Sequence, residues 1–224
     1  MEVQTVKNWN VFVLSLGFML VFTGFDTLGF VQNVILDSAK NNTSDGYVDG
    51  FNGDGYYSYA IIYGVFSIAS WFAPPIVSKI GPRFTLVLGG SCYVLFIAQM
   101  IYPNDILLYV FSAIIGFGAA LIWVAKGNFL TLNSDENTMT RNTGIFWVMI
   151  NSSCFIGNAY VYFQFQGLVD IDKKTRTMVM IHYSKEYLVV TEFTNQGLSI
   201  GKDSKDRGFS KGLLILFYYK GQGL

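Results

Sequence analysis

Charged residues are scarce in this chain of 224 residues, at 13% of the total, and the formal net charge is zero. A soluble domain usually carries about 25% charged residues, so the composition argues against a surface that faces water on all sides. A balanced charge offers no attraction to nucleic acid, and we expect no nucleic-acid partner.

Metal ligands are scarce as well. The chain has one histidine, His182, and two cysteines, Cys92 and Cys154. A zinc site needs several His, Cys or carboxylate ligands at close spacing, and the sequence contains no such cluster. We therefore predict no metal, no cofactor and no enzymatic activity. Both cysteines lie in apolar blocks, and we interpret them as small buried residues rather than as a disulfide.

Apolar residues are abundant, at 52%, and they are gathered in five long blocks. A helix that crosses a membrane needs about 20 mostly apolar residues to pass roughly 30 Å of hydrocarbon. Such blocks must be helices, because lipid leaves the backbone groups of open strands unsatisfied. We predict an all-α membrane protein with spans at about 9–36, 56–77, 84–102, 106–124 and 143–165.

The segments between the blocks predict which side of the membrane each one faces. The segment 37–55 holds four aspartates and one lysine, and it contains two overlapping glycosylation sequons, at Asn41 and Asn42. The next turn, 78–83, is short and purely basic, and positive charge in short loops favours the cytoplasm. We expect residues 1–8 inside, the 37–55 segment outside, and the 78–83 turn and the 126–141 loop inside.

The composition changes after residue 169. Residues 170–224 hold nine of the fifteen Lys and Arg residues, and charges at His182, Lys185, Glu186 and Glu192 interrupt the one stretch where a sixth helix would be expected. Each charge near the middle of a span costs about 2.5–3.5 kcal/mol. We predict a polar tail without a spanning helix, and we prefer an alternative or mis-joined transcript end over a genuine adapted domain.

Several short motifs resemble one branch of a known superfamily. They are Ala60-Ile61-Ile62-Tyr63-Gly64, Pro74-Pro75, Ile80-Gly81-Pro82-Arg83, Trp123-Val124-Ala125-Lys126-Gly127-Asn128, Leu130 to Glu136, Gly144-Ile145-Phe146-Trp147, Ser152-Ser153 and Gly157-Asn158. In this order the motifs resemble the Unc-ninety-three-like branch of the major facilitator superfamily, and within it the "major facilitator superfamily domain-containing" proteins. The resemblance covers roughly Asn8 to Met178.

The resemblance implies a fold of twelve helices in two halves, each made of two three-helix repeats around a central cavity. The five predicted spans would form most of the amino-terminal half-bundle. A substrate site between two halves is incomplete in such a chain. We therefore expect a truncated secondary transporter for an unknown small solute, and we expect that this chain alone does not transport the solute. The alternative is a non-transporting regulator or escort of another membrane protein, such as a channel or receptor.

Two charges within or beside the predicted spans are candidates for binding a substrate or a coupling ion. Asp26 lies inside the first span, where a carboxylate is rare and usually faces a cavity or a partner; the alternative is a polar packing residue. Lys126 follows the fourth span and stands where the family commonly shows Gln. A Lys126–Asp26 pair would have to close a depth difference of about 15 Å, so a lysine that extends to the cytoplasmic interface is preferred.

The resemblance also suggests a cytoplasmic charge clamp. Lys79, Gly81 and Arg83 resemble the superfamily's basic loop, with Ser78 in place of its usual acidic residue. Asp135, Glu136 and Arg141 in the other inner loop could supply partners, although an exposed pair contributes only about 0–1 kcal/mol. The alternative is simple positive-inside topology. Gly116, Gly118 and Ala120 favour close helix contact, and Tyr59, Tyr63, Trp71 and Trp123 are assigned to packing or interface belts.

The sequence predicts an integral multi-pass membrane protein whose first partner is the lipid bilayer. It does not distinguish the plasma membrane from an endolysosomal membrane.

Overall fold

Five helices make up the part of the chain that the computed structural model describes, which is residues 2–41, 51–101 and 104–165. They are α1 (Glu2–Asn41), α2 (Gly55–Ile80), α3 (Pro82–Gln99), α4 (Asp105–Leu132) and α5 (Met139–Phe165). Each coincides with one predicted span, so the all-α fold class is confirmed. Residue 170 and the tail beyond it lie outside the described residues, and the tail stays a prediction.

Four helices, α1, α2, α4 and α5, extend further than the apolar blocks from which they were predicted, whereas α3 ends at Gln99 rather than near Tyr102. α1 begins at Glu2 rather than near Trp9, and α4 continues to Leu132 rather than ending at Val124. The expected inner loop 126–141 is therefore wrong in its bounds, because only 133–138 separate α4 from α5. Hydropathy marks where a helix leaves the hydrocarbon, whereas backbone hydrogen bonds continue the helix beyond that point.

Local signals fix the helix ends. Asp54 and Asn104 cap α2 and α4, since each side chain accepts hydrogen bonds from two backbone N–H groups of the first turn. Gly81 separates α2 from α3 with φ +89°, a conformation that favours glycine, and its N–H donates to the Val77 carbonyl at 2.8 Å. Pro82 follows at the first position of α3, where the missing N–H costs nothing.

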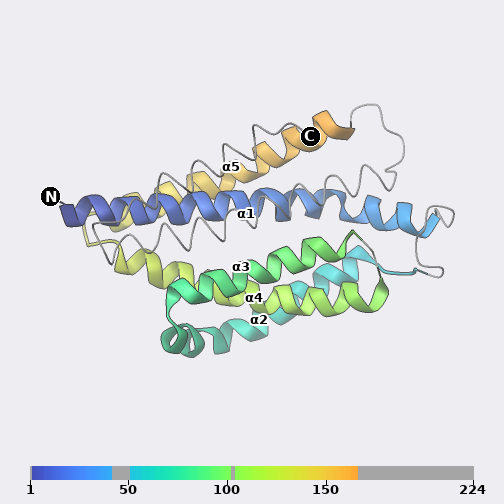
Figure 1. The fold of residues 1–224 in the computed structure, drawn as a ribbon, viewed down its shortest axis with the longest axis horizontal. Helices are drawn as coiled ribbons and strands as arrows, with labels where there is room; N and C mark the ends of the chain where they lie inside the picture. Colours follow the sequence, from blue (N-terminus) through green and yellow to red (C-terminus); the bar gives the residue numbers. More distant parts are fainter. Residues whose placement is uncertain (1, 42–50, 102–103, 166–224) are drawn as a thin grey trace.

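The helices pack in two groups that share one pattern (Figure 1). α1 packs mainly on α5, whereas α2 and α3 both pack on α4. A relation that exchanges α1 with α4 and α2 with α5 would turn the α1–α5 pair into the α4–α2 pair. Such an exchange is what an inverted three-helix repeat produces, and it is the arrangement that the family resemblance implies.

Small residues bring these helices into backbone contact. A Cβ added at Gly116 of α4 would lie 2.6 Å from the Ile62 carbonyl oxygen of α2, and one added at Gly89 of α3 would lie 2.8 Å from the Gly118 carbonyl oxygen of α4. A Cβ at Gly157 of α5 would lie 3.0 Å from the Thr23 carbonyl oxygen of α1. The predicted close-contact role of Gly116 and Gly118 is therefore confirmed.

The outside of the bundle is apolar, as in a protein that faces lipid. Trp71 on α2 is 85% exposed and Phe155 on α5 is 80% exposed. Among the helices of the described residues, four are long and apolar enough to cross a membrane, namely α1, α2, α4 and α5. α3 is the shortest at 18 residues, about 27 Å, and it carries Arg83 near its start and Gln99 at its end.

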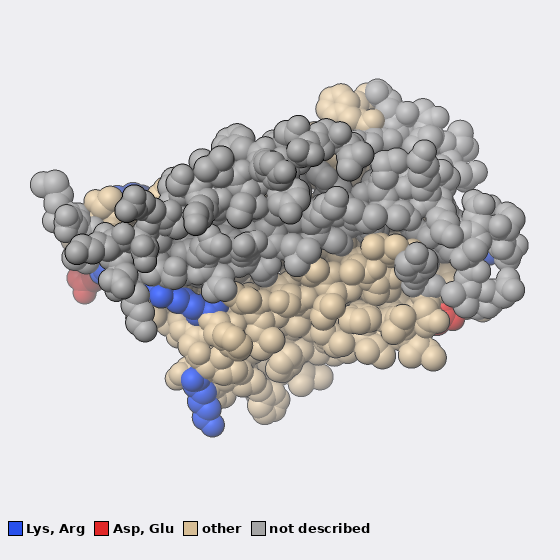
Figure 2. Space-filling view, viewed as in Figure 1, with Lys and Arg blue, Asp and Glu red and all other residues tan. Residues whose placement is uncertain are grey.

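The bundle has two ends, and charged side chains lie toward both of them. We call the end where α1 begins, where α2 turns into α3 and where α4 turns into α5 the inner end, and the opposite end the outer end (Figure 1). On the face that Figure 2 shows, the charged side chains in view lie toward the two ends, and the tan zone between them shows none. This grouping is the one expected of a bundle that crosses a bilayer.

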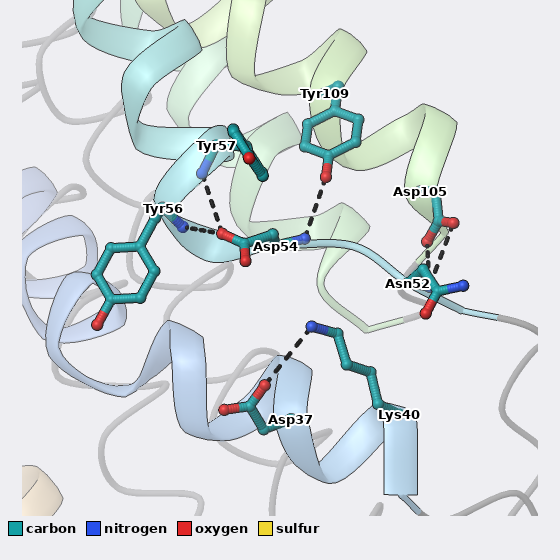
Figure 3. A network of polar contacts seen from close by, with 8 residues as sticks. All are labelled: Asp37, Lys40, Asn52, Asp54, Tyr56, Tyr57, Asp105 and Tyr109. Carbon is teal, nitrogen blue, oxygen red and sulfur yellow. Dashed lines mark hydrogen bonds and ion pairs between the residues drawn. The ribbon is translucent and has the colours of Figure 1, made fainter.

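A polar network connects the helices at the outer end (Figure 3). The Asn52 N–H donates to the Asp105 carboxylate at 3.0 Å, and the Asp54 N–H donates to the Tyr109 hydroxyl at 3.1 Å. Lys40 forms an ion pair with Asp37 at 3.7 Å. The Lys40–Asp37 pair lies within α1, whereas the Asn52–Asp105 and Asp54–Tyr109 contacts hold the start of α2 on the start of α4.

Candidate functional site

Asp26 lies inside α1 and faces α5. The Ser153 hydroxyl lies 3.1 Å from its Oδ2 atom, and the Cys154 thiol donates to the same atom at 3.4 Å. Ser153 Oγ is also 2.5 Å from the Ile150 carbonyl oxygen. A hydroxyl has one proton to donate, so Ser153 can serve the carboxylate or its own helix at any moment. The carboxylate is thus held by one shared donor and one weak donor.

Close approach of α5 to α1 makes this contact possible. Gly157 lies one helical turn after Ser153, and a Cβ there would collide with the Thr27 hydroxyl. Thr27 in turn donates to the Thr23 carbonyl at 2.5 Å, which satisfies its hydroxyl within α1. The glycine therefore lets α5 come near enough for Ser153 to reach Asp26.

Further polar groups lie in the outer half of α1 beside α2. Gln32 is 0% exposed, and within the described residues neither atom of its side-chain amide has a partner. The buried Tyr59 hydroxyl is likewise unpartnered there, and a Cβ at Gly29 would lie 2.7 Å from it. Buried polar groups are normally hydrogen-bonded. Gln32 on α1 and Tyr59 on α2 are thus two buried polar side chains near the outer half of α1 without a hydrogen bond in the described residues.

Lys126 is surrounded by aromatic rings. Its Nζ atom lies 4.6 Å from the centre of the Phe146 ring, 4.9 Å from that of Trp123 and 5.3 Å from that of Trp147. Each ring face attracts a cation, the more so where water is partly excluded. Phe18 of α1 closes the cluster, with its ring 5.1 Å from Phe146 and 5.9 Å from Trp123. We call Trp123, Phe146 and Trp147 the aromatic cage.

Asp26 and Lys126 do not contact each other in the described part of the chain. Asp26 is held by α5, and Lys126 by the aromatic cage. Their placement is consistent with the depth argument made from the sequence. Together the two residues put one carboxylate and one ammonium on helices α1 and α4, both against α5. Such a pair can bind a cation or proton at one point and an anionic group at another.

The residues of the predicted charge clamp lie at the inner end, but the described residues form no ion pair among them. Arg141 donates to Asn8 at 2.7 Å and to Asn142 instead. Asp135 accepts hydrogen bonds from the Thr138 hydroxyl at 2.8 Å and from the Thr138 N–H at 2.9 Å. These bonds, chiefly that of the Thr138 hydroxyl, lower the pKa of Asp135. Glu136 is exposed beside it, so the clamp stays a prediction.

The glycosylation sites are not tested by the structure. Asn41 is the last residue of α1, and Asn42 lies outside the described residues. Modification at either residue remains a prediction.

The sequence offered Asp26 and Lys126 as candidates but did not predict the side chains that surround them. Ser153, Phe146 and Trp147 were noticed only as parts of motifs, and Trp123 was assigned to packing. The signal that could have pointed to them is that a charge inside a span requires partners from a neighbouring helix. The sequence alone does not say which neighbour supplies them.

Residues 50–194 match the family described as "Ion channel regulatory protein UNC-93". The match includes residues 170–194, which fall within the predicted tail. The residue at which the family-like part ends stays a prediction. The comparison with solved structures finds no match.

Curated relatives agree with this match. The UNC93-like protein MFSD11 of Xenopus tropicalis is 39% identical over 181 residues, which cover 81% of this chain and 39% of the relative. Protein unc-93 homolog A of Bos taurus is 32% identical over 160 residues, which cover 66% of this chain and 32% of the relative. UNC93-like protein 3 of Arabidopsis thaliana is 28% identical over 159 residues. The chain thus matches less than two fifths of the length of these relatives.

Proposed function

The chain belongs to the UNC-93 family, and we propose that its five described helices form part of a secondary-transporter-type solute pathway in which Asp26 binds a proton or a small cation. Lys126 would receive an anionic group of the solute. The protein is an integral, multi-pass membrane protein related to the major facilitator superfamily.

One observation carries the proposal: a carboxylate inside a spanning helix with few donors of its own. Asp26 is partly exposed within the described bundle, and only Ser153 and Cys154 are recorded as donors to it. A carboxylate that serves packing alone would be expected to have its oxygen atoms fully satisfied. Unfilled capacity, at a residue that is expensive to place in a membrane, supports exchange with a proton or cation.

Cation binding can be measured without transport. The full 224-residue chain in detergent should unfold at a higher temperature in NaCl or KCl than in choline chloride of equal ionic strength, because an ion bound only to the folded state stabilises it. Asp26→Asn should remove the difference. Asp37→Asn changes an exposed carboxylate on the same helix and should preserve it.

If Asp26→Asn keeps the full salt-specific shift, Asp26 is not the cation site. If the wild type shows no such shift, its unfolding temperature is measured as a function of pH to test whether Asp26 binds a proton instead. A proton site predicts a pH dependence of the unfolding temperature that Asp26→Asn abolishes. A wild type without either dependence contradicts the proposal.

We do not expect this chain alone to carry flux. A substrate cavity in this superfamily forms between two halves, and the chain covers 39% of its MFSD11 relative. Proteoliposomes containing only these 224 residues should therefore show no solute uptake above that of empty vesicles. Uptake by this chain alone would contradict this part of the proposal.

A second candidate function is regulation or escort of another membrane protein. The family description names an ion channel regulatory protein, and α2 and α5 expose large apolar side chains, among them Trp71 and Phe155. Lipid would cover such faces, and so would a partner's helices. This function predicts stable co-purification with a channel or receptor and no cation dependence at Asp26.

A further inference from the structure

A cavity opens at the inner end, away from Asp26. Its volume is 560 Å³, and its walls come from the start of α1, the turn between α2 and α3, and the end of α4. Asn10, Arg83 and Asn133 supply its polar wall, while Ile80, Phe84 and Leu132 are among the apolar residues. We call it the inner-end cavity.

Asn10, one of the residues that line this cavity, has an unsatisfied hydrogen-bond acceptor. The residue is only 5% exposed, and its Oδ1 atom has no hydrogen-bond partner within the described residues. Its Nδ2 atom donates to Asn133 Oδ1 at 2.7 Å, and Asn133 Nδ2 donates to the Phe129 carbonyl at 2.9 Å. Turning the Asn10 amide over would set two oxygen atoms against each other, so this chain of bonds fixes Oδ1 as the acceptor that is buried without a partner.

Positive charge lines the same cavity. Arg83 is exposed and has no carboxylate partner in the described part of the chain. It lies in the first turn of α3, which contains no acidic residue and whose cap, Gly81, has no side chain to accept hydrogen bonds. A helix start of this kind favours an anion, and a guanidinium suits phosphate oxygens in particular.

We propose that the inner-end cavity binds the headgroup of an anionic phospholipid, with Arg83 on the phosphate and Asn10 Oδ1 accepting from a headgroup hydroxyl or ammonium. The Arg83 guanidinium requires a negative charge on the ligand, and Asn10 Oδ1 requires a hydrogen-bond donor. A phosphate diester that carries a serine, glycerol or inositol group supplies both.

The apolar wall favours a lipid over a free phosphate. Phe84 is 63% exposed and Leu132 is 62% exposed, and both line the cavity. Inorganic phosphate would leave these side chains in water, whereas the acyl chains of a lipid would cover them. The cavity also lies at the bundle end where residues enter the aqueous layer, which is the depth of lipid headgroups.

The test measures lipid-dependent stability of the full chain. Purified protein in a neutral detergent is titrated with dioleoyl-phosphatidylserine, with dioleoyl-phosphatidylcholine or with inorganic phosphate, and the unfolding temperature is followed. We expect phosphatidylserine to raise the unfolding temperature at about tenfold lower concentration than phosphatidylcholine does. A tenfold difference in affinity is about what one hydrogen bond to a charged group contributes. Phosphate alone should act weakly.

Matched variants separate this site from general attraction to cations. Arg83→Gln should remove the preference for phosphatidylserine, whereas Lys79→Gln, a cation on the neighbouring last turn of α2 that does not line the cavity, should keep it. Asn10→Asp retains the size of the side chain and places a negative charge in the cavity, so it too should remove the preference if Arg83→Gln fails to fold.

Three results would overturn the inference. Equal stabilisation by the two lipids would show that no anionic headgroup is selected. Equal effects of Arg83→Gln and Lys79→Gln would show diffuse attraction rather than a site. Stabilisation by inorganic phosphate as strong as that by phosphatidylserine would make the cavity a phosphate site. Since none of these variants touches Asp26, the outcome is independent of the proposed cation site.

Discussion

A charged side chain on a helix of a membrane bundle depends on what it contacts, and this chain stabilises two such side chains, Asp26 on α1 and Lys126 on α4, by different means. Asp26 accepts hydrogen bonds from α5. One of them comes from the Ser153 hydroxyl, which can donate instead to the Ile150 carbonyl of α5. Lys126 relies on ring faces from α4 and α5 rather than on an anion. The first arrangement leaves capacity for a proton or cation, and the second leaves the ammonium free of a carboxylate.

Ser153→Ala tests how Asp26 is held. The substitution removes the stronger donor from a partly buried carboxylate, and we expect a loss of about 1–3 kcal/mol in the free energy of unfolding. Ser152→Ala is the matched control, because the Ser152 hydroxyl is recorded only with the Val148 carbonyl of its own helix. Denaturation in mixed micelles measures both. Equal effects of the two variants would show that the Ser153–Asp26 bond contributes nothing specific.

A double-mutant cycle tests the aromatic cage. Lys126→Met and Trp147→Leu, alone and together, should show a coupling of about 0.5–2 kcal/mol, because each variant removes one side of the same cation–ring contact. The same cycle with Trp71→Leu, a highly exposed tryptophan on α2, should show no coupling. Additive effects of Lys126→Met and Trp147→Leu would mean that the rings only pack.

At the scale of the element, the sequence predicted where helices lie better than where they end. The five apolar blocks correspond to five helices because each crossing needs a long apolar run. The bounds differ most for α1 and α4, whose polar ends remain helical beyond the hydrocarbon. Lys126 illustrates the consequence. It was predicted to begin a loop, but it lies inside α4, where its ammonium group contacts the Phe146 ring of α5.

Glycine contacts decide how closely these elements pack. Gly116→Ala would place a Cβ 2.6 Å from the Ile62 carbonyl oxygen and should cost about 1–3 kcal/mol, because α2 must move away from α4. Gly127→Ala, on the same helix with nothing within 4 Å of its Cβ, should be neutral or slightly stabilising. Unfolding in mixed micelles distinguishes them. A Gly116→Ala variant as stable as Gly127→Ala would contradict the packing of α2 on α4.

At the scale of the whole molecule, the bundle has the features of a membrane protein and of one part of a larger architecture. α1 pairs with α5 as α4 pairs with α2, and the outer surface carries large apolar side chains. The family and the all-helical fold followed from the sequence, because motif order and apolar length are both local. The partners of Asp26, the aromatic cage and the inner-end cavity did not, because each joins residues far apart in the chain.

A bundle of five spans requires every helix to cross the bilayer, and α3 is the shortest of the five and is not among the helices that are long and apolar enough by composition. Single cysteines at Asn52→Cys and Glu136→Cys can be placed in a chain that carries Cys92→Ala and Cys154→Ser, and labelled in sealed vesicles with a membrane-impermeant maleimide. Three helices, α2, α3 and α4, separate the two positions. We predict that the reagent reaches them from opposite sides of the membrane. Labelling of both from the same side would show that α3 does not cross, and the five-span bundle would be wrong.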